Sequence, residues 1–126
     1  PRLNTDLVKI IRKSIQNNLR SINIKWRKEK SMTIVLCAKG YPGAYKKNLL
    51  IKNIDKIKQF KNNFIYHAGT MILNNELRSS GGRVLNFTSL GNNFSKIREK
   101  VISNIKKLNW KYGFFRKDIG FKVIKK

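Results

Sequence analysis

The first apolar positions of the chain recur every four residues and are separated by polar ones. They are Leu7, Ile11, Ile15 and Leu19. Because a helix turns once every 3.6 residues, this spacing gathers the four side chains on one face. The pattern predicts an amphipathic helix over residues 5–20, with Asn4 or Thr5 as its N-cap. Residues 21–30 are polar and basic with alternating apolar positions, and they predict a short strand or an extended connector.

Runs of apolar and β-branched residues in the middle of the chain predict strands. Residues 33–38 form a continuous run, which is typical of a central strand buried on both faces. Residues 64–67 and 83–88 predict two more strands, and residues 71–73 are expected to pair with the first of these across a turn. The segment 113–121 predicts a terminal strand or hairpin.

The clearest helical pattern lies late in the chain. Its apolar positions are Phe94, Ile97, Val101, Ile105 and Leu108. Asn93 precedes them and is a suitable N-cap. A shorter helical spacing joins Ile54, Ile57 and Phe60. Together these patterns predict an α/β (α+β) fold, in which a mixed, largely antiparallel sheet is covered by one long helix.

Length and composition exclude several classes of protein. The chain has 126 residues, of which 40% are hydrophobic, so one domain, or one domain with an attached fragment, can bury a core. No apolar run reaches the roughly 18 residues that a membrane-spanning helix needs, and no secretory leader is recognisable. The single cysteine, Cys37, cannot form an internal disulfide. Because the chain begins with Pro1, we expect it to be a piece of a longer protein.

The net charge of +23 has two interpretations. Lysine and arginine displace counterions from phosphate backbones, so the charge indicates nucleic-acid binding. However, Lys (21), Asn (15) and Ile (16) fill 52 positions, and all three have A/T-rich codons, so genome composition alone can produce the excess. Arginine, which reads phosphates and bases through its fork of donors, occurs only 8 times. Both interpretations stay open at this point.

The titratable residues do not suggest a catalytic or metal centre. The six carboxylates are scattered, and no pair of them has the spacing of a metal site or an acid–base pair. His67 is the only histidine, and Cys37 lies in an apolar run where a buried, unreactive thiol is expected. We therefore predict no catalytic and no metal-binding residues in this chain. Arg116 and Asp118 are expected to form an ion pair that orders the C-terminus.

Three glycine-bearing turns adjoin the predicted strands, so all three are expected at one edge of the sheet. They are Gly40-Tyr41-Pro42-Gly43, His67-Ala68-Gly69-Thr70 and Ser79-Ser80-Gly81-Gly82-Arg83. The first predicts a type II turn with a positive φ at Gly43. In the third, two glycines allow the backbone to turn its amides toward an anion, and Arg83 offers a guanidinium that matches phosphate. The alternatives are a hairpin turn followed by a surface cation, and a purely structural role for His67.

The order of these motifs resembles the C-terminal part of the phosphoribosylamine–glycine ligase family. The motifs are Ala38-Lys39-Gly40-Tyr41-Pro42-Gly43-Ala44-Tyr45, His67-Ala68-Gly69-Thr70, Gly81-Gly82-Arg83-Val84-Leu85 with Thr88 and Leu90-Gly91, and Phe115-Arg116-Lys117-Asp118-Ile119-Gly120. The opening Pro1-Arg2-Leu3 with Thr5-Asp6-Leu7 resembles the segment that follows the family's metal-binding Gly-Asp-Pro-Glu stretch. The resemblance covers essentially the whole chain, but only the last part of the family's usual length.

The resemblance implies an ATP-grasp ligase of de novo purine synthesis, which joins glycine to 5-phosphoribosylamine and gives glycinamide ribonucleotide, ADP and phosphate. Residues 1–30 would be the C-terminal end of the ATP-grasp domain, its last helix and a connector, and residues 31–126 the substrate-closing domain. ATP and Mg²⁺ would be held outside this chain, so the chain alone is expected to be inactive. Its partners would be small molecules in the cytoplasm, with no membrane and no specific nucleic acid.

The resemblance also implies a set of substrate-binding residues. They are Gly81, Gly82, Arg83, His67, Gly69 and Thr70. The first three would hold the phosphoribosyl phosphate, and the other three would shape the same pocket. The sequence departs from the family at Ser80, where Asn is usual, and at Asn86 and Phe87, where smaller residues are usual. The alternatives are a small basic RNA-binding or ribosomal protein, whose strand aromatics would stack on bases, and a truncated, nonfunctional remnant.

Overall fold

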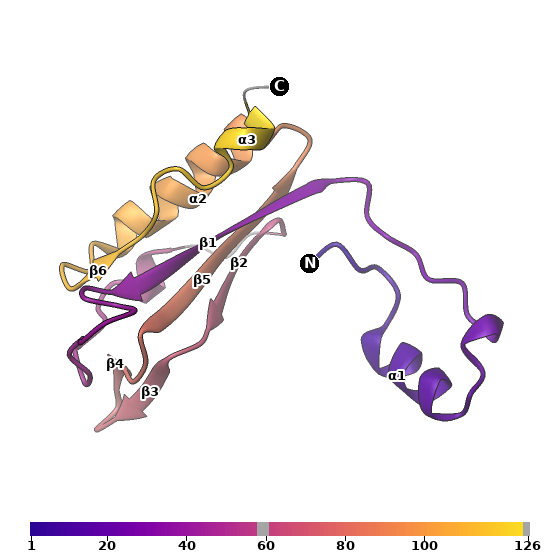
Figure 1. Cartoon of the computed structure of the whole chain (residues 1–126), viewed down its shortest axis with the longest axis horizontal. Helices are drawn as coiled ribbons and strands as arrows, with labels where there is room; N and C mark the ends of the chain where they lie inside the picture. Colours follow the sequence, from indigo (N-terminus) through magenta and orange to yellow (C-terminus); the bar gives the residue numbers. More distant parts are fainter. Residues whose placement is uncertain (58–60, 125–126) are drawn as a thin grey trace.

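The computed structural model describes residues 1–57 and 61–124, and it shows a sheet backed by a long helix, with an N-terminal arm standing to one side (Figure 1). In chain order the elements are α1 (Leu7–Ile15), η1 (Leu19–Ser21), β1 (Lys30–Ala38), η2 (Ile54–Lys56), β2 (Asn63–His67), β3 (Thr70–Leu73), β4 (Glu76–Ser79), β5 (Arg83–Gly91), α2 (Phe94–Leu108), β6 (Gly113–Phe114) and α3 (Phe121–Ile124). The helices labelled η are single turns of 3₁₀-helix.

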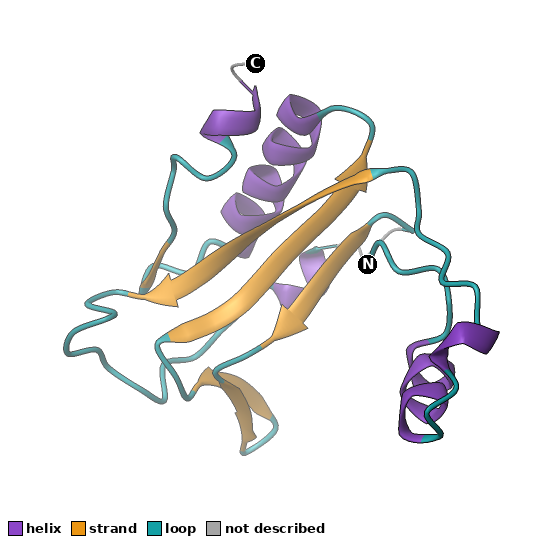
Figure 2. Cartoon of the chain, turned by 45° about the vertical axis from the view of Figure 1, so that its right-hand side comes forward, coloured by secondary structure: helices purple, strands orange, loops and turns teal. Residues whose placement is uncertain are grey.

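The main sheet has the strand order β2-β5-β1-β6, and its neighbouring strands run antiparallel. At its centre, β1 and β5 lie side by side from Lys30↔Gly91 to Cys37↔Arg83, with a shift of register after Leu36. The predicted strands 33–38, 64–67 and 83–88 correspond to β1, β2 and β5. The predicted antiparallel sheet under one long helix is therefore confirmed (Figure 2).

Only one face of the central strand is buried, so the prediction of burial on both faces is wrong. On the face toward α2, Ile34 and Leu36 are 1% and 3% exposed. On the opposite face, Thr33 is exposed while Val35 and Cys37 are half-buried. The reason is that α2 covers one side of the sheet, and no described helix lies over the other (Figure 2). The uncovered face is thus accessible to a ligand or to another protein segment.

Helix α2 stabilises the sheet because its apolar stripe points at the buried face. The buried residues of the stripe are Ile97, Val101, Ile105 and Leu108. Each such side chain contributes about 1.5–3 kcal/mol when it is removed from water. The Asn93 side chain accepts a hydrogen bond from the Lys96 amide at 3.1 Å, which confirms the predicted N-cap. The helix therefore holds the centre of the sheet in place. The turns described below extend from the ends of its strands.

The predicted pairing of residues 71–73 with β2 is wrong. Strand β2 pairs with β5, whereas β3 pairs with β4, a strand that the sequence did not reveal. The turn between β3 and β4 consists of Asn74 and Asn75, with φ values of 50° and 59°. Two successive residues with positive φ match the twist of a tight hairpin, and asparagine adopts this conformation readily. The two strands therefore form a separate hairpin beside the main sheet (Figure 2).

The last part of the chain forms one short strand rather than a hairpin. The predicted terminal strand is present as β6, which pairs with the end of β1. Residues 119 and 120 lie in the turn that leads into α3, and Phe121 is the first residue of that helix. The helical spacing that begins at Ile54 produces only the single turn η2. Phe60, which completes that spacing, lies outside the described residues.

The N-terminal arm, residues 1–29, closes on itself before the chain enters the sheet (Figure 1). Leu3 and Trp26 form an antiparallel bridge, and the Arg27 amide donates to the Arg2 carbonyl at 2.7 Å. The Arg27 guanidinium then reaches the body of the protein, where it donates to the Asn62 side chain at 2.9 Å. The arm is therefore attached near one end of β2 and makes no layer with the sheet.

Helix α1 is shorter than predicted, and its cap is a different residue. The Asp6 carboxylate accepts a hydrogen bond from the Lys9 amide at 2.9 Å, so Asp6 is the N-cap in place of Asn4 or Thr5. The helix ends at Ile15, since Asn17 adopts a left-handed φ of 53°. None of its residues is buried. Within the described residues, no helix has the length and apolar character needed to cross a membrane.

Candidate functional site

The three glycine turns meet at one end of the main sheet, as their places beside strand ends predict. We call this region the glycine rim and define it as residues 40–43, 67–70 and 79–83. The Gly69 amide donates to the Arg83 carbonyl at 2.8 Å, and the Gly81 amide donates to the Gly69 carbonyl at 3.2 Å. The Ala38 amide, at the end of β1, donates to the Gly82 carbonyl at 2.8 Å. Backbone hydrogen bonds thus hold the second and third turns to each other and to β1.

The glycines of the rim are required where one turn packs against another. A Cβ on Gly69 would lie 2.6 Å from the Cα of Gly81, and a Cβ on Gly82 would lie 2.1 Å from the ring of Tyr41. The positive φ of the first turn belongs to Gly40 (97°) and not to Gly43, so the predicted type II turn is wrong. The Tyr41–Pro42 peptide in this turn is cis. The glycines therefore serve first to let three turns occupy one small space.

The close contact between the turns also decides which amides are available to an anion. The Ser80 and Gly81 amides both donate to the Gly69 carbonyl, at 2.8 and 3.2 Å. They are thus engaged within the rim, contrary to the expectation that the two glycines turn their amides outward. The Gly82 amide has no hydrogen-bond acceptor among the described residues. Gly82 is itself a buried residue that packs against the ring of Tyr41, so this amide lies beneath the surface of the rim.

Arg83 differs from the other arginines of residues 30–124 in the hydrogen bonding of its guanidinium. The guanidinium groups of Arg78, Arg98 and Arg116 each donate to a carboxylate or a backbone carbonyl. For Arg83, which is exposed, no hydrogen bond or ion pair is formed within the described part of the chain. An arginine that is already engaged is a poor ligand for phosphate, because a new contact must replace an existing one. Arg83 has no such contact to lose.

The other predicted site residues lie next to Arg83 in the rim. His67 and Thr70 share a hydrogen bond of 2.9 Å between Nδ1 and Oγ1. This bond orients the imidazole at the end of β2, where His67 pairs with Leu85 of β5. The six predicted residues are thus brought together by the backbone bonds described above. They form a polar edge with one unpaired cation.

A cavity of about 320 Å³ lies beside the rim on the uncovered face of the sheet. It is lined by Thr33, Val35, Cys37, Tyr41, Pro42, Phe114, Arg116 and Ile119. Tyr41 belongs both to the cavity and to the rim, since its ring lies against Gly82. Sequence reasoning missed this cavity because it depends on the pairing of Cys37 with Phe114 across β1 and β6, which no local motif encodes.

Cys37 is half-buried in this cavity rather than enclosed in the core. Burial raises the pKa of its thiol, and the positive charge of Arg83 acts in the opposite direction. The residue is therefore a protonated thiol at neutral pH, in agreement with the expected unreactive cysteine. Cys37 pairs with Arg83 across β1 and β5, so the backbone of Arg83 lies next to this wall of the cavity.

The C-terminal segment is held in place by the predicted ion pair and by a second arginine. The Arg116 guanidinium donates to both carboxylate oxygens of Asp118, at 2.5 and 3.1 Å, and this hydrogen bonding lowers the pKa of Asp118. Arg98 of α2 donates to the Ile119 carbonyl at 2.9 Å and also to the Lys117 carbonyl. These bonds fix the wall of the cavity that Arg116 and Ile119 form.

In the residues that the structure describes, no three His, Cys, Asp or Glu side chains gather in a way that could hold a metal ion. The rim presents the guanidinium of Arg83, and an apolar cavity lies beside it. A guanidinium next to an apolar cavity suits an anionic group attached to a small molecule.

Comparison with known proteins shows the family to which this fold belongs. The family described as "Phosphoribosylglycinamide synthetase, C domain" matches residues 31–122. The chain therefore belongs to this C-domain family. The matched segment begins at the second residue of β1 and contains the rest of the main sheet, α2 and the glycine rim.

Individual relatives agree with the family match. A phosphoribosylamine–glycine ligase of Agrobacterium fabrum is 37% identical over 123 residues, which is 98% of this chain and 29% of that protein. The chloroplastic phosphoribosylamine–glycine ligase of Arabidopsis thaliana is 33% identical over 126 residues, which is 24% of its length. The crystal structure of a phosphoribosylamine–glycine ligase from Thermotoga maritima has the same fold, with a TM-score of 0.66 at 24% identity, over 87% of this chain and 27% of that one. The chain thus spans less than a third of the relatives it matches, and these matches give no support to an RNA-binding protein.

Proposed function

We propose that this chain is the C-terminal part of a phosphoribosylamine–glycine ligase. Such a ligase joins glycine to 5-phosphoribosylamine at the expense of ATP and forms glycinamide ribonucleotide. The observation that carries the proposal is the family match over residues 31–122, supported by relatives whose printed names state this activity. The proposed setting is de novo purine synthesis in the cytoplasm.

Residues 1–30, which are the arm and the first residue of β1, are proposed to be the end of the ATP-grasp domain that precedes the C domain in a complete ligase. Three observations support this division. The family match begins at residue 31, the arm closes on itself through the bridge between Leu3 and Trp26, and the arm makes no layer with the sheet. The apolar stripe of α1 is exposed, with Ile15 at 78%. In a complete enzyme this stripe would be covered by the preceding domain.

The glycine rim is proposed to bind the phosphate of 5-phosphoribosylamine. The exposed guanidinium of Arg83 would donate to two phosphate oxygens. Gly69 and Gly81 would hold the two turns together, while His67 and Thr70 would shape the edge of the pocket. The proposal is supported by the exposed guanidinium of Arg83, which has no hydrogen-bond or ion-pair partner among the described residues.

This role makes the chain a binding component of the reaction. A phosphate held at the rim fixes one end of the substrate, so that its amine is directed toward the rest of the enzyme. ATP supplies the activation of glycine when it is bound. The ATP and Mg²⁺ of the reaction are proposed to bind in the part of the enzyme outside this chain, as the family resemblance implies.

The test compares the chain alone with a chimera. In the chimera, this chain replaces the matched region of the Agrobacterium fabrum relative and follows the part of that protein that precedes the match. We expect ATP- and glycine-dependent release of phosphate from the chimera in the presence of phosphoribosylamine, and no release above background from the chain alone. A folded chimera without activity, or a chain that turns over alone at the rate of the relative, would contradict the proposal.

A further inference from the structure

A second concave region adjoins the first turn of the glycine rim, between the loop after β1 and the loop after α2. It consists of two adjoining cavities of about 450 and 350 Å³. The first is lined by Lys39, Ala44, Tyr45, Lys46, Leu49 and Tyr112, and the second by Leu50, Lys52, Asn53, Leu108, Asn109, Trp110, Lys111 and Tyr112. Tyr112 belongs to both, so we call the region the Tyr112 groove. It shares no lining residue with the cavity at the rim.

The walls of the groove are held together by hydrogen bonds between the two loops. The Lys39 amide donates to the Tyr112 carbonyl at 2.9 Å. The indole of Trp110, which is only 8% exposed, donates to the Leu50 carbonyl at 2.9 Å. The groove is therefore formed by two loops that are packed and hydrogen-bonded to each other. A site of this kind is largely formed before its ligand arrives.

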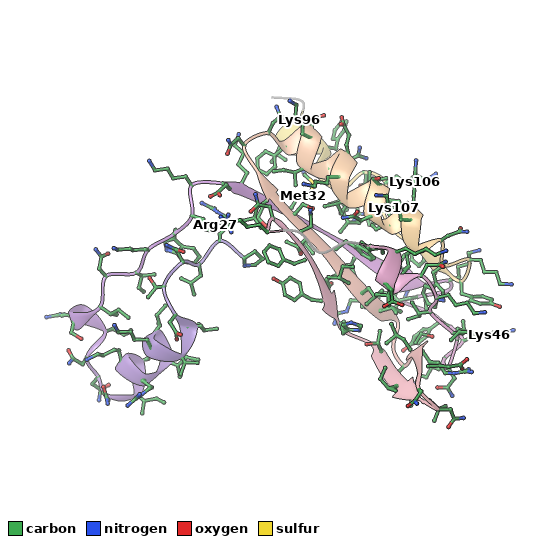
Figure 3. All side chains as sticks on the ribbon, turned by 180° about the vertical axis from the view of Figure 1, so that it is seen from behind. Arg27, Met32, Lys46, Lys96, Lys106 and Lys107 are labelled. Atoms are coloured by element: carbon green, nitrogen blue, oxygen red, sulfur yellow. The ribbon has the colours of Figure 1, made fainter. Side chains whose placement is uncertain are left out.

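The lining of the groove combines lysines with tyrosines. Four of its residues are lysines, namely Lys39, Lys46, Lys52 and Lys111, and none of the lining residues has a carboxylate. Figure 3 shows Lys46 at the end of the molecule farthest from α1. Two tyrosines, Tyr45 and Tyr112, stand among these cations, and the Lys111 ammonium lies 5.0 Å from the centre of the Tyr112 ring. The groove thus combines flat ring surfaces with positive charge.

We propose that the Tyr112 groove binds a nucleoside phosphate, separately from the substrate site at the rim. A nucleobase stacks on aromatic side chains, and such a stack is favourable for every base because each has a π-face. Lysines place positive charge where the phosphates would lie. The volumes of both cavities fall within the range of small-molecule sites. This binding goes beyond the proposed ligase function and does not depend on it.

The high net charge of the chain is the main competing explanation, because any anion is attracted to a molecule of charge +23. The two explanations differ in whether the stacking of the base on Tyr112 contributes to the binding affinity. General attraction acts on the phosphate alone and is the same at every lysine. Binding in the groove requires the base as well as the phosphate, and it requires Tyr112 and the lysines that line it.

The experiment is a calorimetric titration of the full 126-residue chain at about 0.15 M salt, where attraction between exposed charges is screened beyond roughly 8 Å. The probes are ADP, ribose 5-phosphate, which lacks the base, and adenosine, which lacks the phosphate. We expect ADP to bind at least fivefold more tightly than either fragment. Equal binding of ADP and ribose 5-phosphate, or no binding of ADP, would overturn the proposal.

Matched variants locate the site. Tyr112→Ala should weaken ADP binding by about fivefold or more, the lower end of what one base stack contributes. The control is Tyr66→Ala, because Tyr66 is similarly exposed (42% against 37%) and lies on β2, outside the groove. Lys46→Gln should weaken binding more than Lys96→Gln, which removes an exposed charge on α2 (Figure 3). The lysine pair keeps the test valid if Tyr112→Ala fails to fold, and equal effects within either pair would overturn the proposal.

Discussion

The arm and the sheet-and-helix body both contain a helix with an apolar stripe, yet the two stripes have opposite environments. In α1 the stripe residues Leu7, Ile11 and Ile15 are 58%, 49% and 78% exposed. In α2 the residues Ile97, Val101 and Ile105 are 3%, 0% and 5% exposed. The spacing of the two stripes is nearly the same. What differs is that α2 has a sheet beneath it and α1 has no partner among the described residues.

This difference teaches what helical periodicity can and cannot establish. Periodicity identifies the face of a helix that has an apolar surface, but it does not identify what covers that face. For α2 the partner lies in the same chain, in β1 and β5. For α1 the proposed partner is the ATP-grasp domain of the complete enzyme. The predictions that follow test this contrast, beginning with the largest effect.

The stability of the body should depend on its core, whereas the arm should contribute little. Phe87 lies in β5 and is 1% exposed, so Phe87→Ala should lower the free energy of unfolding by about 3–5 kcal/mol. Ile15→Ala, at a 78% exposed position, should change it by no more than about 0.5 kcal/mol. Urea unfolding followed by circular dichroism measures both. A large effect at Ile15 would mean that α1 has a partner in the chain alone.

The packing of the glycine turns should tolerate no side chain at its centre. Gly69→Ala places a Cβ 2.6 Å from the backbone of Gly81 and Arg83, and such overpacking costs about 1–3 kcal/mol of stability. Gly43→Ala is the matched control, since its Cβ would meet only the Gly40 carbonyl oxygen, at 3.3 Å. Thermal unfolding should therefore separate the two variants. If they are equally stable, the contact between the turns does not hold the rim together.

The smallest expected effect concerns Cys37, which is intermediate between the exposed arm and the core. Burial raises the pKa of its thiol, so the thiolate forms at a higher pH than in an ordinary cysteine. Alkylation by iodoacetamide at pH 8 should be slower in the folded chain than in urea. Arg83→Ala should slow it further, because the nearby positive charge that favours the thiolate is removed. The control Arg12→Ala, in the arm, should leave the rate unchanged, and a faster reaction in Arg83→Ala would contradict the placement of that guanidinium.

The sequence predicted the elements whose signals are local. The stripe of α2 and its cap Asn93 are examples, because both depend only on neighbouring residues. The β3–β4 hairpin was missed, since its apolar residues are few and its turn, Asn74-Asn75, is also typical of a loop. The burial of β1 on one face was missed because it depends on which side of the sheet the helix takes.

In the candidate site, too, the features that depend on local signals were predicted and those that depend on the folded arrangement were not. The meeting of the glycine turns followed from their places at strand ends. The unpaired state of Arg83 did not, because it depends on where the partners of Arg78, Arg98 and Arg116 lie in space. The Tyr112 groove was also invisible in the sequence, since its two walls, residues 39–53 and 108–112, are far apart along the chain and meet only in the folded structure.

The central claim is that Arg83 holds the phosphate of phosphoribosylamine, and steady-state kinetics of the chimera test it most directly. Phosphoribosylamine is formed in the assay from ribose 5-phosphate and ammonia. A charge-assisted phosphate contact contributes about 1.5–3 kcal/mol, so Arg83→Ala should raise the KM for phosphoribosylamine by roughly tenfold or more and leave the KM for glycine nearly unchanged. Lys96→Ala should change neither value. An unchanged KM for phosphoribosylamine in Arg83→Ala, or an equal rise for both substrates, would contradict the claim.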